Sequence, residues 1–236
     1  MKSFFERIWE KIRNGWLYLG EHRQAAVWGG IILILLIVAV IWRFNSGGLA
    51  GNQAGKQSPQ NKLRQQFADQ LPDLQKQVEK DPNNPDLQQQ LGVAKYATND
   101  LQGAKEAYEK GVSLNSDNAI MHNNLGNVYR DLSDYSKAEA EYRRAMELNP
   151  KLTTPYSNLA SIYQYNLGKP ETALAIYESG IKSVPEYIDF YNSIALLYEQ
   201  QGLKDKAIDA FKRALKVQPS NQAAQSGLER LEEASR

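Results

Sequence analysis

AIMHNNLGNVYRDLSDYSKAEAEYRRAMELNPKL, residues 119–152, decides the fold, because its pattern of small, apolar and aromatic residues returns twice further along the chain. His122, Tyr156 and Tyr191 occupy equivalent places and stand 34 and 35 residues apart. A period of this length is typical of two-helix solenoid units, none of which buries its apolar face without stacking on a neighbour. The sequence therefore predicts an all-α fold, a stack of antiparallel helix pairs.

Within each period the residues resemble the tetratricopeptide consensus, with His122 in the place usually given to tryptophan. The residues that carry the resemblance are His122, Leu125, Gly126, Tyr129, Ala138, Tyr142, Ala145 and Pro150; then Tyr156, Leu159, Ala160, Tyr163, Ala173, Tyr177, Gly180 and Pro185; then Tyr191, Ile194, Ala195, Tyr198, Ala207, Phe211, Ala214 and Pro219. The resemblance implies a right-handed tetratricopeptide superhelix. We expect small residues such as Gly126 to let paired helices approach closely, while rings such as Tyr142 fill the gap to the next pair.

The repeat domain is predicted to cover residues 62–236. Its parts are a packing helix at 62–81, repeats at about 85–118, 119–152, 153–187 and 188–221, and a capping helix at 222–236, because terminal repeats must be capped to stay soluble. The first repeat matches at Leu91, Gly92, Ala104, Tyr108 and Gly111, whereas Gln88, Lys95 and Ser116 depart from the consensus. The third repeat has one extra residue, predicted to lie in its turn near Gly168 and Lys169, with Pro170 opening the next helix.

Residues 25–43 are predicted to form a single transmembrane helix. Ala25 to Trp42 contains no charged residue, and as a helix these eighteen residues span about 27 Å, close to the hydrocarbon thickness of a bilayer. The alternative is a cleaved signal peptide, but Arg43 and Phe44 separate the apolar run from the small residues that cleavage requires.

Residues 1–24 are predicted to form an amphipathic helix lying in the membrane interface, since apolar side chains recur there at helical spacing with basic residues opposite. The alternative is that this helix packs against the membrane segment of a partner protein. Residues 44–61, rich in Gly, Asn, Gln and Ser, are predicted to be a flexible linker. More bases precede the apolar run than follow it, which predicts a cytoplasmic N-terminus and an extracytoplasmic repeat domain: the bases are Lys2, Arg7, Lys11, Arg13 and Arg23 before it, and Arg43, Lys56 and Lys62 after it.

Composition argues against several classes of function. Lysine and arginine total 28 against 27 acids, so no chain-wide field attracts nucleic acid. There is no cysteine, and the two histidines, His22 and His122, are far apart, so no metal or other cofactor is predicted. We also find no phosphate loop and no nucleophile with a neighbouring base, and therefore do not expect an enzyme.

Function is then expected at variable positions of the first helices, which line a concave groove. The predicted peptide-binding residues are Asn123, Asn124, Asn127, Arg130, Asn158, Ser161, Gln164, Asn192 and Ser193. The carboxylate clamp of some tetratricopeptide domains is absent, since its places hold Gln89, Val93, Asn124, Thr154 and Asn158. Asn124 and Asn158 instead resemble the asparagine ladder of O-linked N-acetylglucosamine transferase, from which Gln90 and Ser193 depart.

The resemblance implies a membrane-anchored scaffold that binds protein or peptide clients and assists the assembly or quality control of a membrane or envelope complex. The expected partners are such clients and, through residues 1–43, the lipid membrane; self-association stays open because repeat proteins associate through uncapped ends. Two alternatives remain: a regulatory or targeting subunit of an enzyme or of a secretion or pilus machine, and an organelle import receptor, which would need cytosolic repeats.

Overall fold

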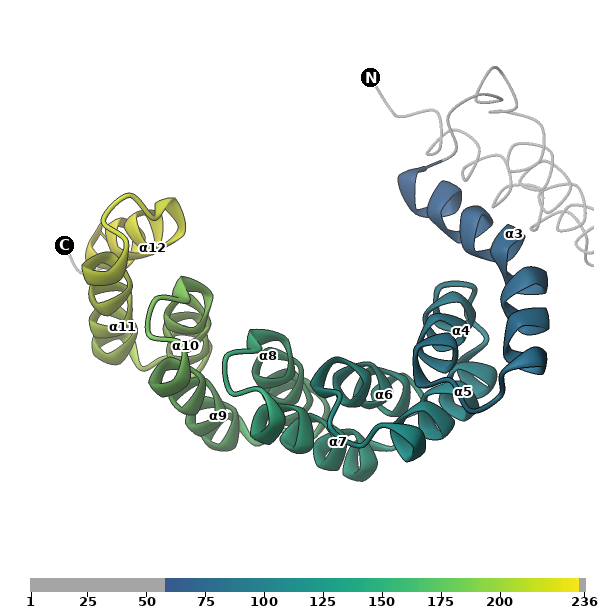
Figure 1. Cartoon of the computed structure of the whole chain (residues 1–236). Helices are drawn as coiled ribbons and strands as arrows, with labels where there is room; N and C mark the ends of the chain where they lie inside the picture. Colours follow the sequence, from purple (N-terminus) through teal and green to yellow (C-terminus); the bar gives the residue numbers. More distant parts are fainter. Residues whose placement is uncertain (1–57, 234–236) are drawn as a thin grey trace, which may run out of the picture. The chain divides into compact units, whose positions relative to one another are not determined.

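The computed structural model describes residues 58–233, which form ten α-helices and one π-helical turn without a strand (Figure 1). The all-α prediction is confirmed for this part of the chain. The predicted interfacial helix, 1–24, the transmembrane helix, 25–43, and most of the linker, 44–61, lie outside the described residues. Among the helices between Pro59 and Glu233, none is both long and apolar enough to cross a membrane.

Eight of the helices form four consecutive pairs. The pairs are α4 (Pro85–Ala97) with α5 (Leu101–Leu114), α6 (Ala119–Asp131) with α7 (Tyr135–Leu148), α8 (Thr153–Ser161), continued by η1 (Ile162–Asn166), with α9 (Pro170–Ser183), and α10 (Ile188–Gln200) with α11 (Lys204–Val217). Figure 1 shows the first helices along the inner side of an arc and the second helices along its outer side. Before the pairs lies α3 (Pro59–Lys80) and after them α12 (Gln222–Glu233). Because α3 begins at Pro59, the predicted linker boundary at residue 61 is wrong by three residues.

The helices of a pair approach closely where a small residue meets a ring. A methyl group placed on Gly126 would lie 2.7 Å from Cε1 of Tyr142, and the same distance separates such a group on Gly92 from Cε1 of Tyr108. Successive pairs use the same device, since Gly180 of α9 lies against the ring of Phe190 on α10. Tyr142 and Phe190 are both fully buried. The stack therefore has one continuous core in which small and large residues alternate.

A recurrent side-chain hydrogen bond, here called the turn latch, joins each first helix to the turn before it. A side chain near the start of the helix donates to the backbone carbonyl six residues earlier. The latches are Gln88 to Pro82 (3.0 Å), His122 to Ser116 (3.0 Å), Tyr156 to Pro150 (3.2 Å), Tyr191 to Pro185 (2.9 Å) and Gln225 to Pro219 (2.8 Å). Gln88 thus performs the same structural task as the tyrosines, although it departs from the consensus.

The latch of Gln225 places α12 where the first helix of a fifth pair would lie. Its buried residues Ala224 and Leu231 face α11. Four residues after the latch, where Gly92 and Gly126 stand in the earlier pairs, α12 has the exposed Glu229. A charged, long side chain there would not let a second helix approach α12 as closely as the paired helices of the earlier repeats approach each other.

All four pairs are closed by a three-residue turn whose middle residue is left-handed. The φ angles are 68° at Asn99, 63° at Ser133, 62° at Gly168 and 72° at Gly202. Glycine adopts this conformation without a steric cost, asparagine tolerates it, and serine is strained by it. The turn geometry thus repeats even where the residue at its centre changes.

The extra residue of the third repeat lies in the first helix and not in the turn, which corrects the prediction. The turn after η1 has three residues like the others, and Pro170 opens α9 as predicted. The backbone N–H of Leu167 donates to the carbonyl of Ile162, five residues back, at 3.0 Å, whereas the equivalent N–H of Leu132 donates four residues back. One residue is therefore inserted within a π-helical turn, after which the hydrogen bonds resume in register.

Exchanging the residues at two turn centres tests the left-handed conformation. We expect Gly202→Ala to lower the free energy of unfolding by about 1 kcal/mol, because an L-residue is strained there and no neighbouring atom within 4 Å would contact the new methyl group. Ser133→Gly is the reciprocal variant and should raise the same free energy. Denaturant unfolding of both variants measures the difference, and equal stability of the two would contradict the strain.

Candidate functional site

The first helices carry all nine side chains predicted to bind a peptide, and the side of the arc that these helices line is here called the inner surface. The nine lie on α6, α8, η1 and α10. Each of them has a hydrogen-bond or ion-pair partner within the chain. A ligand must therefore use the remaining capacity of these groups or exchange with an existing partner.

Four asparagines, Asn123, Asn124, Asn127 and Asn158, form a cluster that joins α6 to α8. The Oδ1 atom of Asn127 accepts hydrogen bonds from the Asn158 amide at 2.9 Å and from the Tyr142 hydroxyl at 2.8 Å. Asn158 also lies 3.4 Å from Oδ1 of Asn123, which is 7% exposed. Asn123 is buried, whereas Asn124 and Asn158, the two residues of the predicted ladder, are partly accessible.

Tyrosines of the second helices reach the inner surface through the core. The hydroxyl of Tyr108 accepts a hydrogen bond from Asn124, and that of Tyr177 accepts from Ser193 and Ser161. Burial raises the pKa of Tyr108 and of Tyr177, so both hydroxyls stay protonated. The sequence predicts a packing role only for these rings, whereas their hydroxyls also belong to the site.

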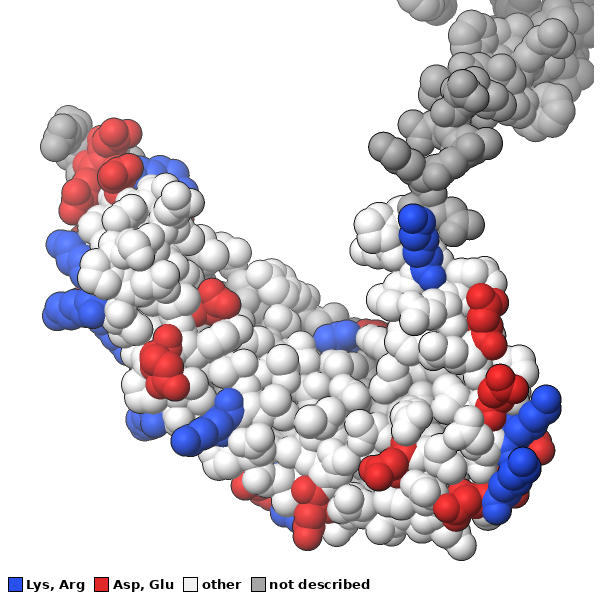
Figure 2. All heavy atoms as spheres, turned by 45° about the horizontal axis from the view of Figure 1, so that its top comes forward, with Lys and Arg blue, Asp and Glu red and all other residues white. Residues whose placement is uncertain are grey.

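Charges on the inner surface are balanced within the chain. Nε of Arg130 lies 2.9 Å from Oδ1 of Asp131, whose other oxygen accepts from the Tyr96 hydroxyl at 2.5 Å. Burial, together with Asp131, raises the pKa of Tyr96 to about 12. Near the other end, Glu199 pairs with Arg230 of α12 at 2.7 Å. Figure 2 accordingly shows a hollow that is mostly uncharged, with lysines, arginines and acids gathered mainly along its edges.

The surface over the third and fourth repeats is more open. Gln164 of η1 donates to Gln200 of α10 at 2.7 Å, and Leu196 on the same helix is 48% exposed. The adjoining Tyr165 is 70% exposed. Asn192 donates to Asn221, the N-cap of α12, at 3.3 Å, while its own Oδ1 is buried without a partner in the described part of the chain.

Within residues 58–233, no three acids or histidines are grouped so that they could hold a metal ion. The charged side chains Arg130, Asp131 and Glu199 are engaged by partners on the same or a neighbouring helix. The arrangement suits binding through neutral hydrogen bonds and apolar contact.

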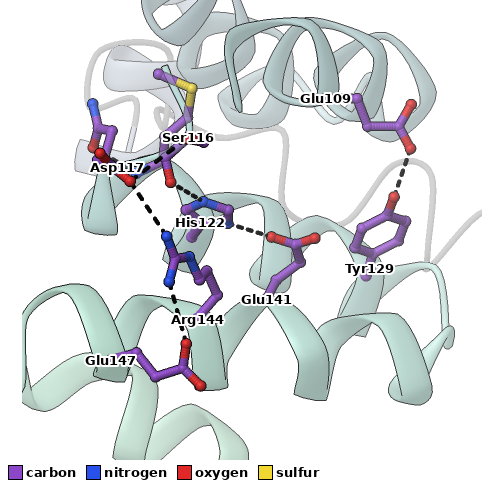
Figure 3. A network of polar contacts seen from close by, with 10 residues as sticks. Glu109, Ser116, Asp117, His122, Tyr129, Glu141, Arg144 and Glu147 are labelled. Carbon is purple, nitrogen blue, oxygen red and sulfur yellow. Dashed lines mark hydrogen bonds and ion pairs between the residues drawn. The ribbon is translucent and has the colours of Figure 1, made fainter. Parts of the chain in front are cut away.

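His122 lies away from the asparagines, in a polar network between α6, α7 and the preceding turn (Figure 3). Its Nδ1 lies 2.6 Å from Oε2 of Glu141, and its Nε2 lies 3.0 Å from the Ser116 carbonyl oxygen. Both partners are acceptors, so the imidazole satisfies both only when it is doubly protonated. The hydrogen bond to Glu141 raises the pKa of His122 above 6.5, although burial and the nearby Arg144 oppose this.

The raised pKa predicts that His122 makes stability depend on pH. A group whose pKa is higher in the folded state contributes stability below its unfolded pKa, and this contribution is lost as the pH rises through the folded value. We expect the free energy of unfolding to fall as the pH rises from the ordinary histidine pKa of about 6.5 through the higher pKa of His122 in the folded state. Denaturant unfolding at several pH values measures this change.

His122→Gln is the matched control, because Gln88 and Gln225 form the same latch with a side chain that does not titrate. The variant should stay folded and lose the part of the pH dependence that His122 contributes. An identical pH profile in wild type and variant would show that the network does not hold a protonated histidine.

Comparison with known proteins gives family matches within the described region. A tetratricopeptide repeat model matches residues 119–152 and 188–221, and a second TPR repeat model matches residues 92–132. No curated protein sequence matches the chain.

Several solved structures are similar in fold. The crystal structure of MamA is 28% identical, covers 70% of this chain and 96% of its own, and has a TM-score of 0.58. The C-terminal part of a TPR repeat-containing protein from Cytophaga hutchinsonii is 26% identical, with 67% and 65% covered and a TM-score of 0.56. YrrB, described as a TPR protein with an unusual peptide-binding site, is 21% identical, with 72% and 88% covered and a TM-score of 0.54.

Proposed function

We propose that this chain, which carries tetratricopeptide repeats, holds a client polypeptide against the inner surface of those repeats. The observation that carries the proposal is the asparagine cluster, in which Asn158 donates from α8 to Asn123 and Asn127 on α6. Asn124 is held by Asn123 and by the Tyr108 hydroxyl. A surface whose side chains are already ordered loses little conformational entropy when a ligand binds.

Amide side chains suit a peptide ligand because each can donate to a carbonyl and accept from an N–H group. A peptide backbone offers both groups in alternation, whatever its sequence. The balanced charges around Arg130 and Glu199 leave no site for a client carboxylate. YrrB supports the proposal at the level of the fold, since it is a TPR protein described as having an unusual peptide-binding site.

A photocrosslinking experiment tests the inner surface. A photoreactive amino acid at Ser157, beside Asn158 on α8, should crosslink to a polypeptide in cells, whereas the same residue at Glu106, exposed on the outer helix α5, should not. Asn124→Ala combined with Asn158→Ala should reduce the crosslink at Ser157 about thirtyfold, if each amide contributes about 1 kcal/mol to binding.

The variant must remain folded for this result to count, which circular dichroism of the purified full chain establishes. Equal crosslinking at Ser157 and Glu106, or an undiminished yield from a folded double variant, would contradict binding at the asparagine cluster.

We propose further that the repeats are held at a membrane and assist the assembly or quality control of a complex there. The support is the uncharged apolar run within residues 25–43 and the excess of bases before it. This orientation places the repeats outside the cytoplasm and disfavours an import receptor.

Topology mapping tests the location. The full chain should remain with membranes after alkaline carbonate extraction. Protease added to spheroplasts should digest the repeats, whereas repeats in the lumen of an intact organelle should be protected. A reporter fused after Arg236 gives an independent measure of the same side. Release by carbonate would refute the anchor, and repeats on the cytosolic side would favour the import-receptor alternative.

A further inference from the structure

We propose that the third and fourth repeats form the specificity-determining end of the inner surface, which binds an extended, uncharged peptide segment through an apolar side chain. This end consists of Gln164, Tyr165, Leu196 and Gln200. The inference rests on the proposed function and adds to it the location and the chemical class of the ligand.

The π-helical turn η1 distinguishes this end from the other described first helices. Asp131, the last residue of α6 in the second repeat, is engaged by Arg130 and Tyr96. Tyr165 lies within the π-helical turn itself and is 70% exposed. An irregular helix turn that leaves a large aromatic ring in water gains nothing from packing, and such departures from regular structure are concentrated at functional sites.

Tyr165 lies over the inner surface. It is close enough to Tyr177 to raise the pKa of that hydroxyl, although burial is the largest cause of the increase, and the same hydroxyl accepts from Ser161 and Ser193. Ser193 and Leu196 are three residues apart on α10 and so share one helix face. The two exposed apolar side chains therefore flank one stretch of the inner surface.

Leu196 is an apolar residue at a place where the second and third repeats have Asn127 and Ser161. It is 48% exposed, so a ligand side chain would find an uncovered aliphatic surface there. Burying such a surface against an apolar ligand side chain is favourable by about 25 cal/mol for each Å² removed from water. The leucine and the tyrosine suit one apolar side chain of a peptide, and the two amides suit backbone N–H and C=O groups that the peptide does not use internally.

The charges at this end select against a charged ligand. Glu199 makes contacts of 2.7 and 3.0 Å to one nitrogen of Arg230, so its carboxylate is already neutralised. The pair Gln164 and Gln200 is uncharged and retains donors and acceptors for a peptide backbone. A charged peptide would lose hydration here without gaining a counterion.

A random linear peptide library displayed on phage, selected against the full chain in lipid nanodiscs, tests the proposal. Selected peptides should be uncharged around an aliphatic or aromatic residue. A labelled selected peptide is then titrated by fluorescence anisotropy against Tyr165→Ser and Leu196→Ser, each of which should weaken binding at least tenfold. The affinity should change less than twofold between about 50 mM and about 500 mM salt, since no ion pair is formed.

Two controls separate the ligand site from a general loss of structure or surface. Leu132→Ser makes the same change at a leucine that is 39% exposed in the turn between α6 and α7, and should not alter the affinity. The variant with Asn124→Ala and Asn158→Ala reports on the asparagine cluster.

Each remaining outcome decides against the inference in a different way. Binding lost only in the double asparagine variant would overturn it while leaving the proposed function standing, and selection of no peptide would overturn both. Acidic or basic peptides whose binding falls tenfold with salt would overturn the uncharged ligand. A wild-type dimer in light scattering that Leu196→Ser dissociates would identify a second copy of the chain as the occupant.

Discussion

The contact between a small residue of the first helix and a tyrosine ring of the second connects the fold to the inner surface. Gly92 lies against Tyr108 and Gly126 lies against Tyr142, so closely that a methyl group would overlap the ring. Because the backbone of the first helix is so near, each tyrosine passes beside that helix and its hydroxyl reaches the asparagines beyond it. The same ring stabilises the pair and orients the amides.

This contact explains why residues that match the family pattern still influence the surface where a ligand would bind. A phenylalanine in place of Tyr142 would preserve the packing but would remove a donor to Asn127, which also accepts from Asn158. The fourth repeat has Phe211 at the equivalent place, so it lacks such a hydroxyl. The order of the inner-surface side chains thus depends on one tyrosine hydroxyl in each of the first three repeats, and the fourth repeat is without it.

The helices of the repeats could be predicted from the sequence because their period depends on residue types at fixed spacings. The position of the extra residue could not be predicted. The spacing gives the number of residues between Tyr163 and Pro170, but it does not show which backbone hydrogen bonds span five residues instead of four. The role of Gln88 could not be predicted for a similar reason. Glutamine and tyrosine are chemically different side chains, but each donates to the carbonyl six residues earlier in its own repeat. The asparagines were recognised as polar, whereas their links to tyrosine hydroxyls depend on side-chain geometry.

The two ends of the inner surface are therefore prepared for a ligand in different ways. Hydrogen bonds between α6 and α8 order the asparagines before any ligand arrives, which favours affinity for a backbone of any sequence. Tyr165 in the π-helical turn and Leu196 on α10 are exposed, so an apolar ligand group can displace water there. A ligand lying along both regions would be held by the asparagine cluster through its backbone. The surface around Tyr165 and Leu196 would select among ligands, because discrimination between similar peptides requires contacts that depend on their side chains.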